Sequence, residues 1–590
     1  MKNIYLKTTK LYIRQEEKIH KIVNLGDWCI NLQDRLNSNF THHIKQLETK
    51  ENIYLYLSNL KERIIFSLID FLNDFHKIKK DYKYWNFIIG PWLLQLLHVT
   101  YDRWSVFDSH KELENQDLFT LIVDTPMENL IPEEMHLSKR FYYQDLWNHF
   151  LFGEIIKFKK QIQFDKISFT DQINLNKIVK NENQKKFSFK NKIIDLFFFV
   201  NNIFNSKDKI NELIFTTNFH YKFQIKTYLK LKIFPIFLKS PPSYQENQIN
   251  NSIRKKVINF NANSNYEKFL EKNICKFIPK SLIENYNEIL KVNLKFYKNF
   301  KTRNFFISQL ETRDQIKFYI AESQNSKKII YQHGGSYGLS KFHFKEQIEV
   351  ESSDYYLTFG WGKAQAMEYL NLEDKNKITN FYPIHLFNKL KAKPKKDFLY
   401  LVLDEFPNYF IEYQSNYDSH SYKLYFKNII NFIKNLDLDN RKKLIVRLYP
   451  QKFNADVPKI LKNYFPEIKI DYASSDFISE VSKVKLCIIA NNSTTFLQTL
   501  RLNIPTIIFW DDKIIRLRQT PSKNFDNLKK SGIFYNNPLD AALFCNKNKK
   551  VYKWWGSSQN KKIVDDFVSE FASKDETKIN KLISIIKSEK

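Results

Sequence analysis

Apolar positions in the first part of the chain recur with the period of helices. Across residues 52–75 an apolar side chain stands at every third or fourth position, which is the pattern of a helix that buries one face. Gly90-Pro91 predicts the start of a second helix over Leu93–Tyr101, because proline suits a first helical turn. With a strand expected at Ile4–Lys7, residues 1–180 are predicted to be mainly helical.

After about residue 180 the pattern changes to short runs rich in β-branched and aromatic residues, which are separated by polar segments. Such runs predict strands. They are Glu212–Thr216, Asn304–Ile307, Lys328–Gln332, Tyr355–Phe359 and Ile378–Tyr382. The polar stretches Asn181–Lys192 and Ser240–Asn265 are predicted to be loops or insertions.

Strand and helix alternate regularly after Lys389–Asp397, a basic segment with one proline that is the best linker candidate. Strands are predicted at Phe398–Leu403, Lys443–Leu448, Ile468–Ile470, Leu486–Ala490 and Ile504–Phe509. Helices are predicted at Tyr422–Leu436, Pro458–Tyr464, Ser475–Ser482 and Thr494–Leu502. Repeated βα units with apolar strands imply a parallel sheet covered on both faces, so the expected fold class is α/β.

Glycine is scarce, and half of it is concentrated in two loops. Five of the ten glycines lie between residues 334 and 362, and both groups directly follow a predicted strand. Ligands of open α/β sheets bind at the carboxyl ends of strands, so we expect both loops to border a cleft. The candidate cleft residues are Gln332, Gly334, Gly335, Tyr337, Gly338, Gly360 and Trp361.

His333 opens the first glycine-rich loop and is the leading candidate for catalysis. Histidine changes its charge near neutral pH, so an imidazole on such a turn can accept a proton from an acceptor hydroxyl. The alternative is a histidine that is hydrogen-bonded within a tight turn and only holds structure. The loop is not a phosphate-binding P-loop, because it lacks the Gly-Lys-Ser/Thr ending, nor a dinucleotide fingerprint.

A polar run precedes one of the later helices and predicts a phosphate site. Asn492, Ser493, Thr494 and Thr495 follow the predicted strand Leu486–Ala490 and open the next helix. Free backbone N–H groups and the helix dipole favour an anion at such an end. The alternative is an ordinary helix cap.

Arg447 closes another apolar strand, where a guanidinium needs an anionic partner. That partner is either a ligand phosphate or an internal carboxylate. Asp437 and Asp439 form a DxD pattern at the wrong end of the sheet, and Asp511-Asp512 lacks further ligands. We therefore expect chemistry that is independent of metal.

The excess of basic residues suggests an anionic partner. There are 93 lysines and arginines against 64 acidic residues, a formal net charge of +29. Part of this excess is typical of AT-rich coding, and the rest suits an anionic donor or an anionic membrane face. No nucleic-acid-binding motif is present, so no nucleic acid partner is expected. Four scattered cysteines, no visible signal peptide and no apolar run of roughly 20 residues favour a cytoplasmic protein.

Several motifs spread along the chain together carry a resemblance. They are Leu25–Cys29, Tyr84-Trp85, Gly90–Trp92, Tyr101–Trp104, Gln332–Gly338, Arg447–Pro450 and Trp554-Trp555. The pattern resembles GT-B glycosyltransferases, among them CDP-glycerol glycerophosphotransferases and capsule-polysaccharide transferases. A closer match is a bacterial transferase family first noted in leptospires and linked to surface carbohydrate synthesis.

The resemblance implies two Rossmann-like lobes that face a cleft, with a helical N-terminal elaboration. It makes residues 1–180 a part of the acceptor lobe and 181–388 the acceptor lobe itself, with the Gln332–Gly338 loop. Residues 398–555 would form the nucleotide-donor lobe, and 556–590 a C-terminal helical tail.

The resemblance also implies roles for particular residues. His333 would activate the acceptor, while Arg447 and Ser493–Thr495 hold the donor phosphates. Tyr449 stands where glycerophosphotransferases carry histidine, and Gln498 where many GT-B enzymes carry a glutamate, so the donor stays open. Trp92 and Arg103 could contact a sugar; the alternatives are a core tryptophan and a surface Asp102–Arg103 pair.

The expected activity is metal-independent transfer of a glycosyl group from a nucleotide sugar, with no further cofactor. The expected acceptor is a cell-surface polysaccharide, a glycan or a lipid-linked glycan. The first alternative is transfer of a non-glycosyl unit such as a phospho-alditol. The second is a non-catalytic scaffold in peripheral contact with an anionic membrane, at the inner face of the cytoplasmic membrane.

Overall fold

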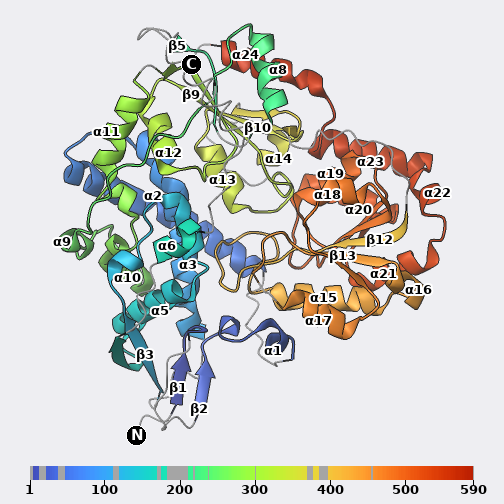
Figure 1. Ribbon diagram of the computed structural model, residues 1–590, viewed down its shortest axis with the longest axis horizontal. Helices are drawn as coiled ribbons and strands as arrows, with labels where there is room; N and C mark the ends of the chain where they lie inside the picture. Colours follow the sequence, from blue (N-terminus) through green and yellow to red (C-terminus); the bar gives the residue numbers. More distant parts are fainter. Residues whose placement is uncertain are drawn as a thin grey trace.

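Parallel β-sheets of four, five and six strands follow one another along the chain and organise the fold (Figure 1). This computed structural model describes residues 4–11, 21–37, 47–109, 118–168, 175–181, 210–216, 219–236, 238–298, 300–367, 377–384, 396–453 and 456–588. Most of the predicted linker Lys389–Asp397 and of the predicted loop Asn181–Lys192 lies outside these residues.

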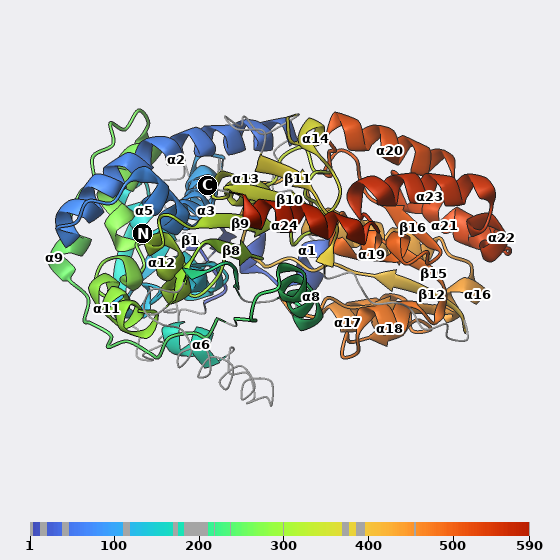
Figure 2. The ribbon, with the colours of Figure 1, turned by 90° about the horizontal axis from the view of Figure 1, so that it is seen from above.

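The C-terminal lobe is a six-stranded parallel sheet in the order β14-β13-β12-β15-β16-β17. Its strands are β12 (Lys396–Val402), β13 (Leu444–Arg447), β14 (Lys469–Asp471), β15 (Val484–Ile489), β16 (Thr506–Phe509) and β17 (Phe534–Tyr535). Helices cover both faces: α20 (Gln519–Lys530) and α23 (Ser558–Phe571) on one side, and α17 (Val457–Tyr464) and α18 (Phe477–Val481) on the other (Figure 2). The predicted parallel sheet with two covered faces is confirmed.

The central lobe is a five-stranded parallel sheet in the order β11-β10-β9-β8-β6. The strands are β6 (Ile214–Phe215), β8 (Asn304–Ile307), β9 (Lys327–Tyr331), β10 (Tyr355–Thr358) and β11 (Ile378–Asn380). Helices α12 (Asp314–Glu322) and α13 (Phe344–Glu351) connect consecutive strands of this sheet. Two Rossmann-like α/β lobes are therefore present, and the predicted fold class is confirmed.

The N-terminal region is rich in helix, as expected, but it also contains a four-stranded parallel sheet. Its long helices are α2 (Leu47–His76), α3 (Tyr82–Ser109) and α5 (Asp145–Lys159). Its strands are β1 (Ile4–Lys7), β2 (Lys21–Asn24), β3 (Leu118–Asp124) and β4 (Gln163–Ser168), of which the sequence predicted only the first.

Pro91 lies inside α3, so the predicted helix start at this proline is wrong. A proline in a helix interior costs about 3 kcal/mol, since it removes one backbone hydrogen bond and crowds the preceding turn. Around Pro91, α3 buries nearly all of its side chains, which offsets that cost. The fully inaccessible ones include Ile88, Ile89, Leu93, Leu94, Leu96 and Leu97.

The C-terminal helices cross back from the C-terminal lobe to the central lobe. Helix α23 packs on α19 (Thr494–Arg501), and α24 (Ile579–Lys587) packs beside α8 (Tyr221–Leu231) (Figure 2). The Lys327 ammonium at the start of β9 donates to the Ser588 carbonyl at 2.6 Å. Helix α24 is thus packed against the central lobe.

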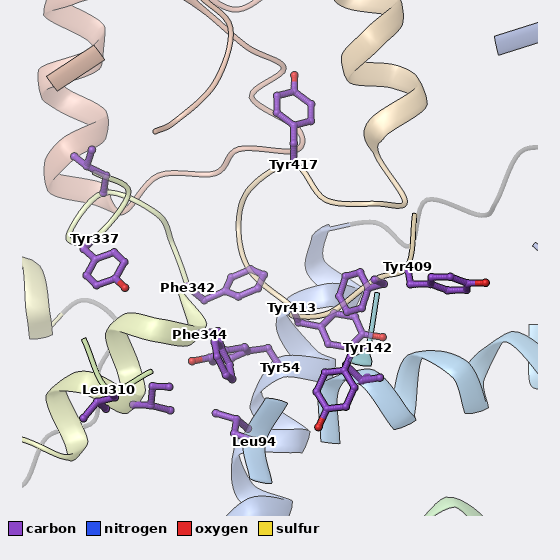
Figure 3. Packing of buried hydrophobic residues seen from close by; sticks show 14 of the residues in the cluster. Tyr54, Leu94, Tyr142, Leu310, Tyr337, Phe342, Phe344, Tyr409, Tyr413 and Tyr417 are labelled. Atoms are coloured by element: carbon purple, nitrogen blue, oxygen red, sulfur yellow. The ribbon is translucent and has the colours of Figure 1, made fainter. Parts of the chain in front are cut away.

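A long segment between β12 and α15 (Tyr422–Lys434) leaves the C-terminal lobe and packs on the N-terminal region. Figure 3 shows Tyr409 and Tyr413 of this segment among buried rings that include Tyr54 and Phe342. The Arg103 guanidinium donates to the Phe410 carbonyl at 2.7 Å and lies 2.9 Å from the Asp102 carboxylate.

Asp102 and Arg103 are both buried, so the alternative of a surface pair is wrong. His420 completes the contact, with its Nε2 at 2.6 Å from Asp102 Oδ1. Arg103 therefore joins two parts of the chain through contacts inside the protein.

Within the described residues, we find no helix of sufficient length and hydrophobicity to span a bilayer.

Candidate functional site at the lobe junction

The glycine-rich loop after β9 and the polar segment before α19, one from each lobe, are in contact. A Cβ placed on Gly335 would lie 2.6 Å from Thr494 Cα and 2.7 Å from Thr494 N, a separation that no side chain tolerates. Glycine at 335 therefore lets the His333–Gly338 loop touch the first turn of α19. The Asn492 amide also donates to Ser340 Oγ at 3.0 Å. We call this contact region the lobe junction.

His333 is held at the lobe junction by a buried carboxylate. Its Nδ1 lies 2.9 Å from Glu349 Oε1 of α13, at ion-pair distance but without the alignment of a hydrogen bond. The His333 side chain is 17% exposed, whereas that of Glu349 is 3% exposed. A carboxylate at this place orients the ring and stabilises the imidazolium that forms when the ring accepts a proton.

Glu349 also accepts a hydrogen bond from the Tyr356 hydroxyl at 3.2 Å, which holds the carboxylate in position. Tyr337 lies in the same cluster, with its hydroxyl 3.4 Å from both His333 Nε2 and Glu349 Oε1. Sequence reasoning missed Glu349. Helix α13 contains three glutamates, of which Glu349 is one, and no sequence pattern distinguishes the one that faces His333.

The other predicted cleft residues of the central lobe brace the loop from inside. Gln332 is fully buried, and its side-chain oxygen accepts from Phe359 N and Trp361 Nε1, both at 2.8 Å. Gly338 has a φ of +72°, and a Cβ there would strike the Trp361 ring at 2.6 Å.

Gly334 and Gly360 also sit in close contacts. A Cβ on Gly334 would lie 3.0 Å from the Tyr337 ring, and one on Gly360 would lie 2.5 Å from the Glu570 carbonyl of α23. These positions set the loop conformation. Of the residues predicted to border the cleft in this lobe, only His333 and Gly334 are partly exposed, and the others are buried.

The donor-side residues cluster at the first turn of α19. Ser493 precedes the helix without a side-chain cap, and its Oγ donates to Asn491 Oδ1 at 2.6 Å. The Thr495 hydroxyl lies 2.8 Å from the same Oγ. Ser493, Thr494, Thr495 and Gln498 are partly exposed, whereas Asn492 is buried. The helix end thus offers hydroxyls and backbone N–H groups to an anion.

Arg447 makes internal contacts, which was the alternative that the sequence left open. Its guanidinium donates to Asp471 Oδ2 at 2.9 Å and to the Ser475 carbonyl at 2.8 Å. Asp471 is its register partner on the neighbouring strand β14. A role for Arg447 in phosphate binding stays a prediction.

Charged groups from all three parts of the chain surround Tyr449, which is 36% exposed. Burial raises the pKa of its hydroxyl, and Asp404 raises it further, whereas Lys139 and Lys345 lower it. Lys139 belongs to the N-terminal region and Lys345 to α13. The predicted donor residue Tyr449 therefore lies within electrostatic range of groups from the other two parts of the chain.

A pocket of about 40 Å³, with room for a few water-sized groups, lies between helices α3, α12 and α13. Trp92, Lys139 and Lys317 line it together with Glu311. Burial opposes ionisation of Glu311, but Lys345, Lys139 and His333 lower its pKa. Trp92 is buried in the hydrophobic core, as the alternative of a core tryptophan expects, and its contact with a sugar stays a prediction.

Asp404, just after β12, is a further site residue that sequence reasoning missed. Burial raises the pKa of its carboxyl to about 7. It accepts from the Asn491 amide at 3.2 Å, and Asn491 accepts from Ser493, so a hydrogen-bonded chain runs from Asp404 to the start of α19. A carboxyl that stays protonated near neutral pH can donate to an anion.

The raised pKa of Asp404 predicts a pH-dependent effect of Asp404→Asn. Because its carboxyl has a folded pKa of about 7 against 3.8 when solvated, ionisation destabilises the fold increasingly as pH rises between these values. The variant lacks this penalty, so its stability relative to the native protein should grow by at most about 1.4 kcal/mol per pH unit in this window. Melting temperatures at pH 5 and pH 8 measure it; a difference that does not change with pH would contradict the assignment.

Among the described residues, one group offers side-chain atoms at metal-ligand spacing: Glu134, His136 and Asp314. His136 Nδ1 lies 3.0 Å from Glu134 Oε2 and 3.6 Å from Asp314 Oδ1. Burial disfavours the charged ring, but the two carboxylates raise the pKa of His136 to about 9. Asp314 also accepts from the Met135 backbone N–H at 2.6 Å, so the group is a hydrogen-bonded ion cluster.

A family model described as "LIC12162 family transferase" matches residues 4–586. The chain belongs to this transferase family. The predicted membership of a transferase family is thereby confirmed, whereas the link to leptospires and to surface carbohydrate stays a prediction. A search of curated protein sequences finds no match.

Three solved structures illustrate what this LIC12162-family protein is similar to. The wall teichoic acid polymerase TagF, in a variant combined with CDPG, has 13% identity and a TM-score of 0.34, and the match covers 68% of this chain and 97% of that one. A UDP-forming α,α-trehalose-phosphate synthase from Burkholderia xenovorans has 8% identity, a TM-score of 0.34 and coverage of 64% and 99%. The N-terminal domain of a Candida albicans trehalose-6-phosphate phosphatase has 11% identity, a TM-score of 0.31 and coverage of 63% and 88%.

Proposed function

We propose that this LIC12162-family transferase moves a glycosyl group from a nucleotide sugar to a hydroxyl of a glycan or lipid-linked glycan destined for the cell surface. The observation that carries the proposal is the lobe junction itself. It brings the loop that carries a partly exposed histidine, with its carboxylate partner, against a helix start rich in hydroxyls. One part can accept a proton while the other stabilises a leaving phosphate.

In the proposed reaction the acceptor oxygen attacks the anomeric carbon of the donor sugar. His333 takes the hydroxyl proton, and Glu349 stabilises the resulting imidazolium. The bond between the anomeric carbon and the phosphate oxygen breaks, and the nucleotide leaves with the electron pair. The first turn of α19, with Ser493 and Thr495, would stabilise the charge on that phosphate.

The acceptor is proposed to reach His333 from the pocket that Trp92 lines. Glu311 lines the pocket, and His333 is among the groups within electrostatic range that lower its pKa. Asp404 would help to hold Asn491 and Ser493 in place on the donor side. We further propose that no metal or additional cofactor takes part, because hydroxyls, N–H groups and a helix dipole supply the positive end.

The first test is nucleotide binding by the purified full chain. Melting temperatures would be measured with UDP-, GDP-, dTDP-, CDP- and CMP-linked compounds. A ligand at about a hundred times its Kd should stabilise the native state by about 2.7 kcal/mol. We expect a shift for one nucleotide class.

A matched pair of variants at Thr495 locates the binding site. Thr495→Glu adds a negative charge at a position where the helix dipole tolerates it, so the fold should persist while the phosphate is repelled. Thr495→Gln has the same size without the charge. We expect the nucleotide-induced shift to disappear in the first variant and to persist in the second. Equal shifts in both variants, or no shift for any nucleotide, would overturn the proposed donor site.

A further inference from the structure

Helix α8 shows an apolar ridge to the solvent. Tyr221, Ile225 and Leu229, four positions apart, are 53%, 40% and 72% exposed. Residues with this spacing lie on one face of a helix. Phe223 and Thr227 are buried on the opposite face of α8, and Tyr228 is buried on the flank away from the lysines. Single exposed apolar residues need no explanation, but an aligned row on a well-anchored helix does.

A row of lysines runs beside this apolar ridge. Lys222, Lys226 and Lys230 each follow one ridge residue, all three are exposed, and α8 contains no acidic residue. Ile225 and Leu229 line a shallow surface hollow with these lysines. Lys226 pairs with Glu576 at 2.8 Å, so one of the three charges is partly neutralised.

Helix α24 extends the basic surface. It lies beside α8 in both ribbon views, and Lys230 Nζ is 3.2 Å from Asn580 Oδ1 (Figures 1 and 2). Lys581 and Lys587 of α24 are exposed, as is Lys232 just after α8. Phe234 adds a further exposed ring, 54% accessible, next to the ridge.

We infer that the α8–α24 face docks on an anionic lipid bilayer. An apolar ridge flanked by lysines is the composition of helices that lie in the plane of a membrane interface. The ridge would enter the boundary between headgroups and acyl chains, while the lysines meet anionic headgroups. The charge fits such a surface and the ridge does not fit nucleic acid, which would leave Tyr221, Ile225 and Leu229 without an apolar partner.

Docking through this face goes beyond the proposed reaction and does not depend on it. Helix α8 directly follows β6, a strand of the sheet that also carries His333 at the end of β9. A bilayer bound at α8 would therefore hold the lobe with the catalytic histidine at the membrane surface, where a lipid-linked acceptor resides.

The test is flotation of the full chain with vesicles of phosphatidylcholine, with and without phosphatidylglycerol. We expect binding that requires phosphatidylglycerol and weakens with salt. A triple variant, Lys222→Glu, Leu229→Ser and Lys230→Glu, should bind at least about tenfold more weakly.

Helix α11 (Tyr286–Phe296) of the same lobe supplies a matched control. Its Leu294 is 69% exposed, close to the 72% of Leu229, and two exposed lysines flank it. The control variant is Lys291→Glu, Leu294→Ser and Lys295→Glu, which makes the same chemical changes off the proposed face. It should bind vesicles like the native protein.

Three outcomes would overturn the inference: no binding of the native chain to anionic vesicles, equal loss in both triple variants, or unchanged binding by the α8 variant. Loss of a dimer in the α8 variant, without native vesicle binding, would assign the ridge to a second copy of the chain. Nucleotide-induced stabilisation of the α8 variant should match that of the native protein, which separates this test from that of the proposed reaction.

Discussion

Replacing His333 by alanine is expected to lower turnover by about 10²–10⁴-fold, the usual contribution of a positioned general base. The side chain is partly exposed at the lobe junction, and its Nδ1 faces Glu349 at 2.9 Å. Removing the ring leaves no nearby group in the described residues with the same geometry. The turnover rate is measured as the release of free nucleotide, with the nucleotide sugar that raises the melting temperature as the donor.

Two comparisons distinguish a base from a residue that only holds the loop. The rise in melting temperature that the nucleotide causes should be the same in His333→Ala as in the native protein, because the donor site is on the other lobe. Glu349→Gln keeps the volume of Glu349 but removes its charge, so we expect a lower kcat with little change in KM for the donor. Full turnover by His333→Ala would contradict the proposed role of His333 as the general base.

Buried parallel strands were the most predictable part of the fold. Predicted and observed bounds of β8, β10 and α19 agree within one residue, because continuous apolar runs and a polar helix start mark them. The strands β2, β3 and β4 were missed. β2 and β4 are short and contain Lys21, Asp165 and Lys166, so their sequences resemble polar segments, whereas the apolar β3 lies in a region that was predicted to be mainly helical.

The candidate site could be predicted residue by residue but not as a contact. His333 and Thr494 each follow a strand, which indicates the carboxyl edge of its own sheet. That the two loops touch depends on how the lobes are placed, and the close approach at Gly335 and the Asn492–Ser340 hydrogen bond show it. Glu349 and Asp404 were missed for the same reason, since their importance comes from neighbours distant in sequence.

Arg447 illustrates a choice that sequence alone leaves open. A guanidinium at the end of an apolar strand needs an anion, and both a ligand and an internal carboxylate satisfy that need. The register of β13 with β14 decides, because it places Asp471 directly beside Arg447. Strand order within a parallel sheet is a tertiary property, and the local sequence does not encode it.

Arg518→Met is expected to destabilise the protein by about 3–5 kcal/mol, because it leaves a buried carboxylate without its partner. Arg518 lies 2.8 Å from Glu346 Oε1, and both side chains are almost inaccessible. The same glutamate accepts from Gly338 N at 2.9 Å, and Arg518 N donates to the Leu339 carbonyl at 2.9 Å. The pair therefore ties the C-terminal lobe to the loop that carries His333.

Two further variants separate the loss of this pair from a general effect of the substitution. Arg518→Met combined with Glu346→Gln removes the unpaired charge and should recover part of the lost stability. Arg303→Met makes the same change in an exposed pair with Glu212, at 3.0 Å, and should cost under about 1 kcal/mol. Melting temperatures measure all three, and nucleotide-induced shifts report on the junction. If Arg518→Met were no more harmful than Arg303→Met, the pair would not hold the lobes together. The placement of the His333 loop against α19 would then rest on the Gly335 contact, on the hydrogen bond between Asn492 and Ser340, and on the backbone hydrogen bonds that join Leu339 to Arg518 and Lys341 to Arg516.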